Sequence, residues 1–398
     1  MYTMAFALLS VFLQTQTLDT GYYYFGNTNV IGVGILEGEE KEGEWKVYVR
    51  NNPEQLPKSS LLQADLEEFE RDFKQEFPLF VIDFEKGVPN GRFLENHPNG
   101  KPKVVTHMTD GVLDGEFSEF QEDGELHFTG TILQGKKDGE WIEYLKSGEI
   151  KTSLIYNQGY LDGKSHGYFP DGSVEWEGVF KKGELDGPYA YYLPDSGIKF
   201  KGQFAKNIPV GEWFEKLEIV PGFYRKGTYK NGLKEGEWQL LGSEGKILQA
   251  EQYKKGKLIS LGEFQIPNPE LDKNKVKNGN GKRYFYNEEG QILAKGKISK
   301  GMVKGNWYFY FPESNRISAL GQLSGSERVG TWYFYSFDGE TLDQIAYGRE
   351  KGESYSGQDS LKLDSGRQGV PFGSGSPLTP DKFAETQMRM STMGQFLK

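Results

Sequence analysis

The sequence of 398 residues contains no cysteine and only four histidines. Without cysteine the chain forms no disulfide, no thiolate nucleophile, no zinc site with cysteine ligands and no lipid-modified N-terminal cysteine. His97, His107, His127 and His166 share no metal-ligand spacing, so each is expected to be a satisfied or solvent-facing side chain. The sequence therefore predicts no metal site.

Motifs for nucleotide or nucleophile chemistry are also missing. We find no G-x-S-x-G, no Walker A segment and no dinucleotide-binding fingerprint, and the close glycines of residues 30–38 lie in a hairpin pattern without a following helix. The net charge of −10 argues against general nucleic-acid binding, which needs clustered lysine and arginine. We expect neither catalysis nor a cofactor.

Long apolar runs are absent, so no transmembrane segment is predicted. The longest run, Met4–Leu13, is too short to cross a bilayer but suits the core of a secretory signal, and residues 1–17 are predicted to be one. No lysine or arginine precedes the run and no A-x-A site follows it. The alternative is a buried first strand.

Glycine and aromatic residues are abundant instead. The chain has 52 glycines and 14% aromatic residues, whereas the apolar fraction is 36%. Many turns and many two-sided strands fit this composition better than one large closed core.

A glycine followed two residues later by an aromatic residue recurs along the chain. From Gly91 to Gly211 every step is 24 residues, and the steps from Gly211 to Gly236 and from Gly305 to Gly330 are 25. Gly163 and Gly281 keep the phase, with Ser165 and Arg283 in the aromatic position. The pairs are Gly43/Trp45, Gly91/Phe93, Gly115/Phe117, Gly139/Trp141, Gly187/Tyr189, Gly211/Trp213, Gly236/Trp238, Gly305/Trp307 and Gly330/Trp332. A period of this length indicates a repeat architecture.

Each unit contains two strand patterns and two turn patterns. The second strand alternates strictly, as in VEWEGVF at 174–180, and its glycine lies on the apolar face. We predict that the glycines at this position are seats for the repeat aromatic rings, which would cover the bare backbone. The alternative is that they mark β-bulges. They are Gly130, Gly178, Gly202 and Gly296.

These residues resemble the MORN repeat, and most closely its bacterial variant in YwqK-type antitoxin component proteins. The best matches are GEWIEY at Gly139–Tyr144 and GNWYFY at Gly305–Tyr310. The resemblance covers about residues 21–348 and implies stacked β-hairpins that act as a scaffold or binding surface. We predict an all-β, elongated, solenoid-like single sheet of antiparallel hairpins over residues 18–348.

Two insertions interrupt the repeat. Residues 54–77 predict an amphipathic helix that packs on the sheet or on a partner, with apolar residues Leu62, Leu66, Phe69, Phe73 and Phe77. Residues 266–280 predict a polar loop.

The repeat pattern stops before residue 349. Residues 349–398 are predicted to be a flexible Gly/Ser-rich tail that ends in a short amphipathic segment, residues 379–397. This segment is either a docking peptide or a helix that covers the last strand. Its candidate binding residues are Phe383, Met388, Met390, Met393 and Phe396.

The last three units carry tyrosines at alternating positions. These side chains are expected on one sheet face, either as an accessible binding surface or beneath a second layer of the same chain. They are Tyr284, Tyr286, Tyr308, Tyr310, Tyr333 and Tyr335.

Together these features favour a non-catalytic protein–protein interaction scaffold, exported as a periplasmic or outer-membrane-associated subunit of a bacterial envelope or secretion assembly. One alternative is a glycan-, cell-wall- or lipid-binding repeat protein with peripheral membrane contact. Another is an intracellular, cytoplasmic antitoxin-like binding protein. The sequence predicts other proteins as partners and no nucleic acid.

Overall fold

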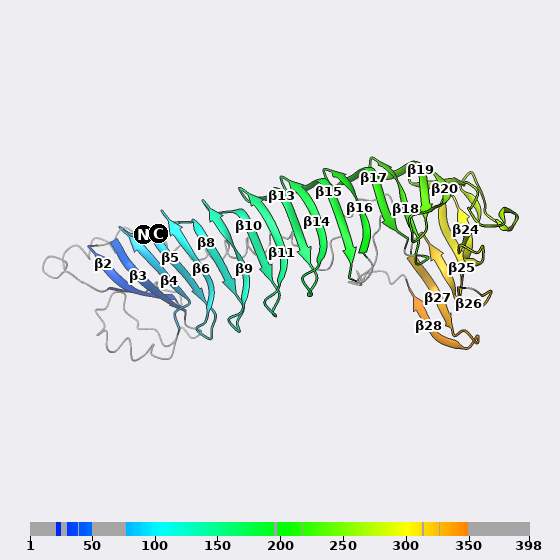
Figure 1. Cartoon of the computed structure of the whole chain (residues 1–398). Helices are drawn as coiled ribbons and strands as arrows, with labels where there is room; N and C mark the ends of the chain where they lie inside the picture. The colour runs from blue at the N-terminus through cyan, green and yellow to red at the C-terminus, as the bar shows by residue number, and fades with distance from the viewer. Residues whose placement is uncertain are drawn as a thin grey trace, which may run out of the picture. The chain divides into compact units, whose positions relative to one another are not determined.

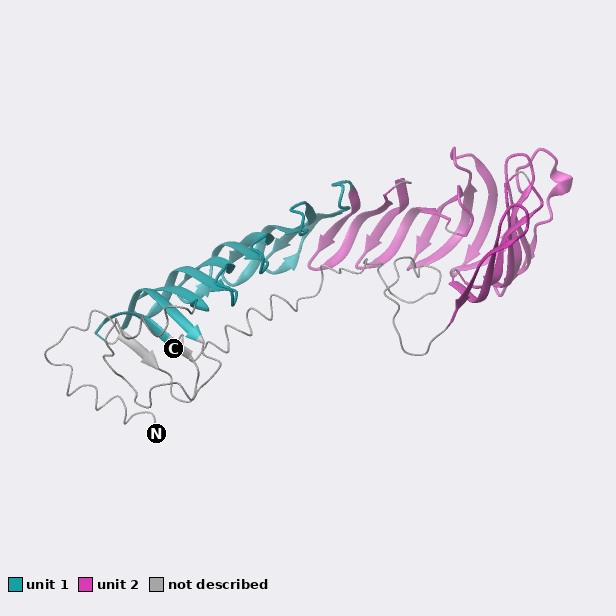
Figure 2. Cartoon of the chain, turned by 90° about the horizontal axis from the view of Figure 1, so that it is seen from below, with its two compact units in different colours: residues 1–173, 379–398 teal, residues 174–378 magenta. Residues whose placement is uncertain are grey.

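The computed structural model describes residues 21–24, 30–38, 40–49, 77–194, 197–217, 219–312, 314–325 and 327–348. The predicted signal segment (1–17), the tail (349–398) and, apart from Phe77, the predicted helix within 54–77 lie outside these ranges. The chain divides into two compact units, residues 1–173 with 379–398 and residues 174–378 (Figure 2).

In the first unit every described element is an antiparallel strand that pairs with its neighbours in chain order (Figure 1). The strands are β1 (Gly21–Tyr24), β2 (Val30–Glu37), β3 (Glu40–Val49), β4 (Phe80–Glu85), β5 (Val88–Asn96), β6 (Pro102–Thr109), β7 (Val112–Leu113), β8 (Gly115–Phe120), β9 (Leu126–Leu133), β10 (Lys136–Tyr144), β11 (Ile150–Asn157), β12 (Tyr160–Leu161) and β13 (Gly163–Tyr168). The prediction of an all-β hairpin repeat is confirmed.

The second unit holds strands of two sheets. The strands that continue the hairpin series are β14 (Val174–Lys181), β15 (Glu184–Leu193), β16 (Gly197–Ala205), β17 (Ile208–Lys216), β18 (Tyr224–Lys230), β19 (Leu233–Leu241), β20 (Ile247–Lys254) and β21 (Lys257–Leu261). A separate sheet contains β22 (Lys275–Lys277), β23 (Asn280–Tyr286), β24 (Ile292–Ser299), β25 (Met302–Tyr310), β26 (Ile317–Ser324), β27 (Glu327–Tyr335) and β28 (Thr341–Tyr347). We call β22–β28 the trailing sheet and β1–β21 the leading strands.

The expectation of a single sheet is therefore wrong. The break coincides with the predicted polar loop 266–280, which contains only a 3-10 turn at Pro269–Leu271 and the three-residue strand β22. It also coincides with Arg283, which occupies the aromatic position of the repeat and is almost fully buried. The seat position eleven residues earlier holds Asp272 instead of glycine, and the Arg283 guanidinium bonds to the Glu251 carboxylate on β20.

Two-residue turns join the strands of most hairpins. Their two central residues have positive φ, as in Gln134 (49°) with Gly135 (75°) and Asn231 (52°) with Gly232 (76°), which is the type I′ geometry that matches strand twist. The turn amide also bonds to the preceding hairpin, because the Gly135 N–H donates to the Leu113 carbonyl at 2.8 Å. The same bond recurs at Gly159, Gly232, Gly256 and Gly325, so a second ladder runs along the turns.

The repeated tryptophans lie over glycines of the preceding strand. A Cβ built on Gly130 would fall inside the Trp141 ring, and Gly34, Gly202, Gly227, Gly296 and Gly321 stand in the same relation to Trp45, Trp213, Trp238, Trp307 and Trp332. At Gly178 the ring is that of Tyr189. At each of these positions only glycine leaves room for the ring, because any other residue would place its Cβ against the ring atoms.

A bulge on the opposite strand makes this contact. Thr129 pairs with Ile142 and Thr131 with Asp138, so Gly139, Glu140 and Trp141 face the single residue Gly130. Gly139 has φ of 69°, and the Trp141 Nε1 donates to the Thr131 carbonyl at 3.0 Å. The ring seat and the β-bulge, the two interpretations of the mid-strand glycine, therefore occur together: the glycine is the seat, and the bulge on the opposite strand places the ring over it.

No helix among the described residues has the length and apolar character needed to cross a bilayer.

Candidate binding face

Strand register gathers three of the predicted tyrosines into one line across the trailing sheet. Tyr284 pairs with Lys295, Lys295 with Tyr308, Tyr308 with Leu320, Leu320 with Tyr333, and Tyr333 with Gln344. Directly paired residues share a sheet face. We call Tyr284, Tyr308 and Tyr333, all half-buried, the tyrosine row.

Tyr310 and Tyr335 lie beyond the tyrosine row, two residues further along β25 and β27. Both are half-buried, and both follow a register irregularity, so that Tyr310 pairs with Ile317 and Tyr335 with Thr341. They extend the aromatic surface along the strands.

Tyr286 differs from the other five tyrosines. Its side chain is 1% exposed and stacks on Tyr284, with ring centroids 6.2 Å apart. The hydroxyl accepts from the Lys273 amide at 2.7 Å and donates to the Leu271 carbonyl at 3.2 Å. Burial raises the pKa of Tyr286 to about 12. This tyrosine anchors the segment before β22 and does not belong to an accessible ladder.

A lysine supplies the electrostatics of the face. The Lys295 Nζ lies 5.5 Å from the ring centroid of Tyr308 and 5.2 Å from that of Tyr310, within cation–π range. In the leading strands Tyr192, which like Tyr310 follows a register irregularity, donates to Glu177 at 2.9 Å, so its nearest charged partner is acidic. The trailing sheet therefore combines aromatic rings with positive charge.

The opposite face of the trailing sheet is packed. Phe285 pairs with Ala294, which pairs with Phe309, and Phe309 lies 5.6 Å from the Trp332 ring. Phe285, Ala294 and Trp332 are at most 1% exposed. The tyrosine row therefore stands on strands that are held rigid from behind.

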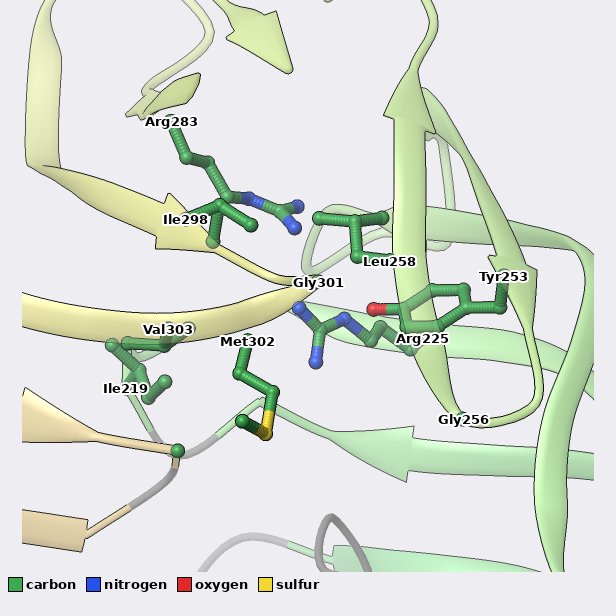
Figure 3. A pocket seen from close by; sticks show the side chains of 11 residues that line it. Ile219, Arg225, Tyr253, Gly256, Leu258, Arg283, Ile298, Gly301, Met302 and Val303 are labelled. Atoms are coloured by element: carbon green, nitrogen blue, oxygen red, sulfur yellow. The ribbon is translucent and has the colours of Figure 1, made fainter. Parts of the chain in front are cut away.

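A buried ion cluster joins the trailing sheet to β18 and β20. Glu251 is fully buried; its Oε1 accepts from Arg283, its Oε2 lies 3.1 Å from the Arg225 Nε, and Tyr253 donates to Oε2 at 2.9 Å. Figure 3 shows Arg225, Tyr253 and Arg283 around a cavity of about 50 Å³. Burial would raise the pKa of Glu251, but the two guanidinium groups outweigh it and hold the pKa well below its usual range, at about 2.

This cluster was not predicted from the sequence. The available signal was Arg283 in a position that otherwise takes an aromatic ring. Its partners, Glu251 and Arg225, lie 32 and 58 residues earlier, a separation that no local pattern marks. The predicted tail residues Phe383, Met388, Met390, Met393 and Phe396 lie outside the described residues. Within the described ranges no group of three or more potential ligands is arranged for a metal ion.

Comparisons with known proteins add little. No family model matches the chain, and no curated protein does. Solved structures with some similarity include the TcdB2–TccC3 complex, at 10% identity and a TM-score of 0.13, covering 81% of this chain and 23% of that chain. The Tc holotoxin pore of Photorhabdus luminescens has 9% identity and a TM-score of 0.14, covering 87% of this chain and 23% of that chain. This chain thus spans less than a quarter of either protein, and similarity at this level carries no argument.

Proposed function

We propose that the chain is a MORN-type hairpin-repeat protein of the bacterial variant and acts as a non-catalytic scaffold for a protein partner. The observation that carries this proposal is the tyrosine row, a line of half-exposed rings on a sheet packed from behind. Tyrosine gives a large contact area with few rotatable bonds and a polar tip, and surfaces of this kind are used for binding.

The proposal includes the site of action. The apolar run Met4–Leu13 has the length of a secretory core, so we propose an exported subunit of a bacterial envelope assembly. Mass measurement of the protein purified from its own cell tests this step. A mature chain that retains residues 1–17 would contradict export by a cleaved signal.

Partner binding is tested by co-purification from the same cell with the Tyr308→Ala and Tyr333→Ala double variant. We expect the partner recovered with the wild-type chain to be lost, because both central rings of the row are removed. Tyr160→Ala is the matched control, since Tyr160 is 61% exposed and lies in the other unit. Equal recovery with the double variant and the wild type would refute the proposed site, provided that both melt at the same temperature.

A glycan chain is a second candidate ligand of the same row. Tyr284, Tyr308 and Tyr333 are two strands apart, which places successive rings about 9.6 Å from one another. This spacing is close to one disaccharide of an extended β-linked glycan. Retention of the chain on immobilised polysaccharide, abolished by the double variant, would favour this candidate over a protein partner.

A further inference from the structure

A line of four lysines crosses the trailing sheet beside the tyrosine row. Lys275 pairs with Lys282, Lys282 with Lys297, and Lys297 with Lys304. All four are exposed, and none forms an ion pair with a carboxylate of the described residues. We call these four residues the lysine strip.

The strip is unfavourable for the isolated sheet. Neighbouring strands are about 4.8 Å apart, and like charges placed directly opposite each other destabilise a strand pair. No carboxylate on the same strands offsets the repulsion between these lysines, because β22–β26 contain no aspartate or glutamate. In a chain of net charge −10, this concentration of positive charge requires an explanation outside the fold.

The repeat itself does not call for lysine at position 304. In several hairpins the residue before the anchor glycine accepts a hydrogen bond from the next turn, although Val210 and Val329 at this position have no acceptor side chain. Asp138 accepts from the Gln158 amide at 3.1 Å, and Glu235 accepts from the Lys255 amide at 2.6 Å. Lys304 occupies the equivalent position before Gly305, and an ammonium group cannot accept such a bond.

We propose that the lysine strip, together with the tyrosine row, binds a short acidic segment of the protein partner. Lys282 and Tyr284 are two residues apart on one strand, so the two rows run side by side about 6.8 Å apart on the same face. A segment that carries carboxylates on one side and apolar or aromatic groups on the other matches both rows. This inference rests on the proposed function and specifies the chemistry of the partner.

Charge favours a short segment over a long polyanion. The chain as a whole carries −10, so an extended nucleic acid or acidic polymer is repelled wherever it reaches beyond the strip. A short segment contacts the strip alone, because charges further away than about 8–10 Å are screened at physiological salt. The strip also contains no arginine, the residue best suited to bidentate phosphate contacts.

The test measures the binding of a short fluorescent poly-L-glutamate peptide to the full chain by anisotropy. The variant carries Lys282→Gln, Lys297→Gln and Lys304→Gln. We expect binding to weaken about tenfold relative to wild type, and wild-type binding to vanish at about 1 M salt. The substitutions remove repulsion between strands, so thermal stability should stay unchanged or rise, which separates lost binding from lost folding.

A matched control removes the same charge elsewhere in the same unit. Lys181→Gln, Lys230→Gln and Lys254→Gln change exposed lysines at the ends of leading strands and should leave peptide binding at the wild-type level. Equal weakening by the control would overturn the proposal, since the peptide would then sense only total charge. Tighter binding of a single-stranded oligonucleotide or of anionic lipid vesicles to the strip would overturn the assignment to an acidic peptide.

The partner itself separates this inference from the proposed function. Co-purification that survives in the lysine variant but fails in the Tyr308→Ala, Tyr333→Ala variant would refute the acidic segment and leave the scaffold proposal standing. Co-purification that survives in both variants would refute the proposed binding site as well.

Discussion

The leading strands and the trailing sheet use one backbone plan with opposite surface charge. Before the anchor glycine, several leading hairpins have an acidic residue such as Asp138 or Glu235, whereas the trailing sheet has Asn280, Lys304 and Val329. Tyr192 of the leading strands donates to Glu177, whereas Tyr310, at the matching position of the trailing sheet, has Lys295 5.2 Å from its ring centroid. The difference shows that the repeat fixes the turns and the ring seats but leaves the outward positions free to carry different chemistry.

The shared plan is visible in the seats. Gly202 lies under Trp213 in the leading strands, and Gly296 lies under Trp307 in the trailing sheet. One detail separates them, because the Trp213 Nε1 donates to the Val210 carbonyl at 3.0 Å, whereas the buried Trp307 Nε1 has no hydrogen-bond partner among the described residues. Packing alone thus holds the Trp307 ring, whereas the Trp332 Nε1 of the same sheet donates to the Gln322 carbonyl at 3.1 Å.

The largest expected effect comes from breaking the cluster that connects the two regions. Glu251→Gln leaves Arg225 and Arg283 buried without their carboxylate, and we expect the free energy of unfolding to fall by about 3–5 kcal/mol. Urea unfolding measures the loss. Glu237→Gln, an exposed change on the adjacent strand β19, should cost less than about 1 kcal/mol, and a similar loss in both variants would contradict the role of the cluster.

Filling a seat should have the next largest effect. Gly202→Val places a side chain where the Trp213 ring lies, and we expect a loss of about 3 kcal/mol in the free energy of unfolding. The chain already contains one hairpin in which the seat is filled and the ring is missing. There Leu154 occupies the seat position and Ser165, eleven residues later on the paired strand, occupies the ring position. Gly202→Leu combined with Trp213→Ser should therefore be more stable than either single variant. If the stability losses of the two single variants instead add in the double variant, the side chains at positions 202 and 213 do not compete for the same space.

A lysine packed against the ring of a hairpin should make the stability of the protein depend on pH. The Lys137 Nζ lies 4.1 Å from the Trp141 ring centroid, and burial lowers its pKa from 10.5 to about 8 against the opposing effect of Glu119 and Glu143. Between pH 8 and 10 Lys137 is protonated in the unfolded chain but largely neutral in the folded chain. The free energy of unfolding should therefore rise by about 2 kcal/mol as the pH is raised through this range.

Above pH 10 the trend should reverse. Burial raises the pKa of Tyr156 to about 12, so the unfolded chain loses this proton first and stability declines. Lys137→Val copies Val303, which lies at the matching position before Trp307 in the trailing sheet. Urea midpoints at pH 8 and pH 10 should differ less in this variant than in the wild type, and an unchanged difference would assign the effect to other groups.

The smallest effect should come from making the trailing sheet resemble the leading strands. Lys304→Glu converts a like-charge pair with Lys297 into an attractive pair, which should raise the free energy of unfolding by about 1 kcal/mol. Lys304→Gln should give about half of this gain. Loss of stability in the glutamate variant would show that the strip is not strained in the free protein.

The period and the alternation of residues were sufficient to predict hairpins and strand faces, because turn glycines and ring positions act locally. The placement of Tyr284, Tyr308 and Tyr333 on one face followed from alternation alone. The burial of Tyr286 did not, since it depends on Leu271 and Lys273 in a segment without periodicity. The two sheets and the Glu251 cluster were missed because their contacts are distant in sequence.

Six of the seven tryptophans follow a glycine seat by eleven residues, from Gly34 and Trp45 to Gly321 and Trp332. A contact of such low sequence separation closes with little loss of chain entropy, so each hairpin with a seated tryptophan has its own nucleus and folding can start at any of them. The turn amides then couple a hairpin to the one before it, as Gly135 does to Leu113. Such a chain can therefore become longer or shorter by whole hairpins, because each added hairpin brings its own ring and seat and needs no new core.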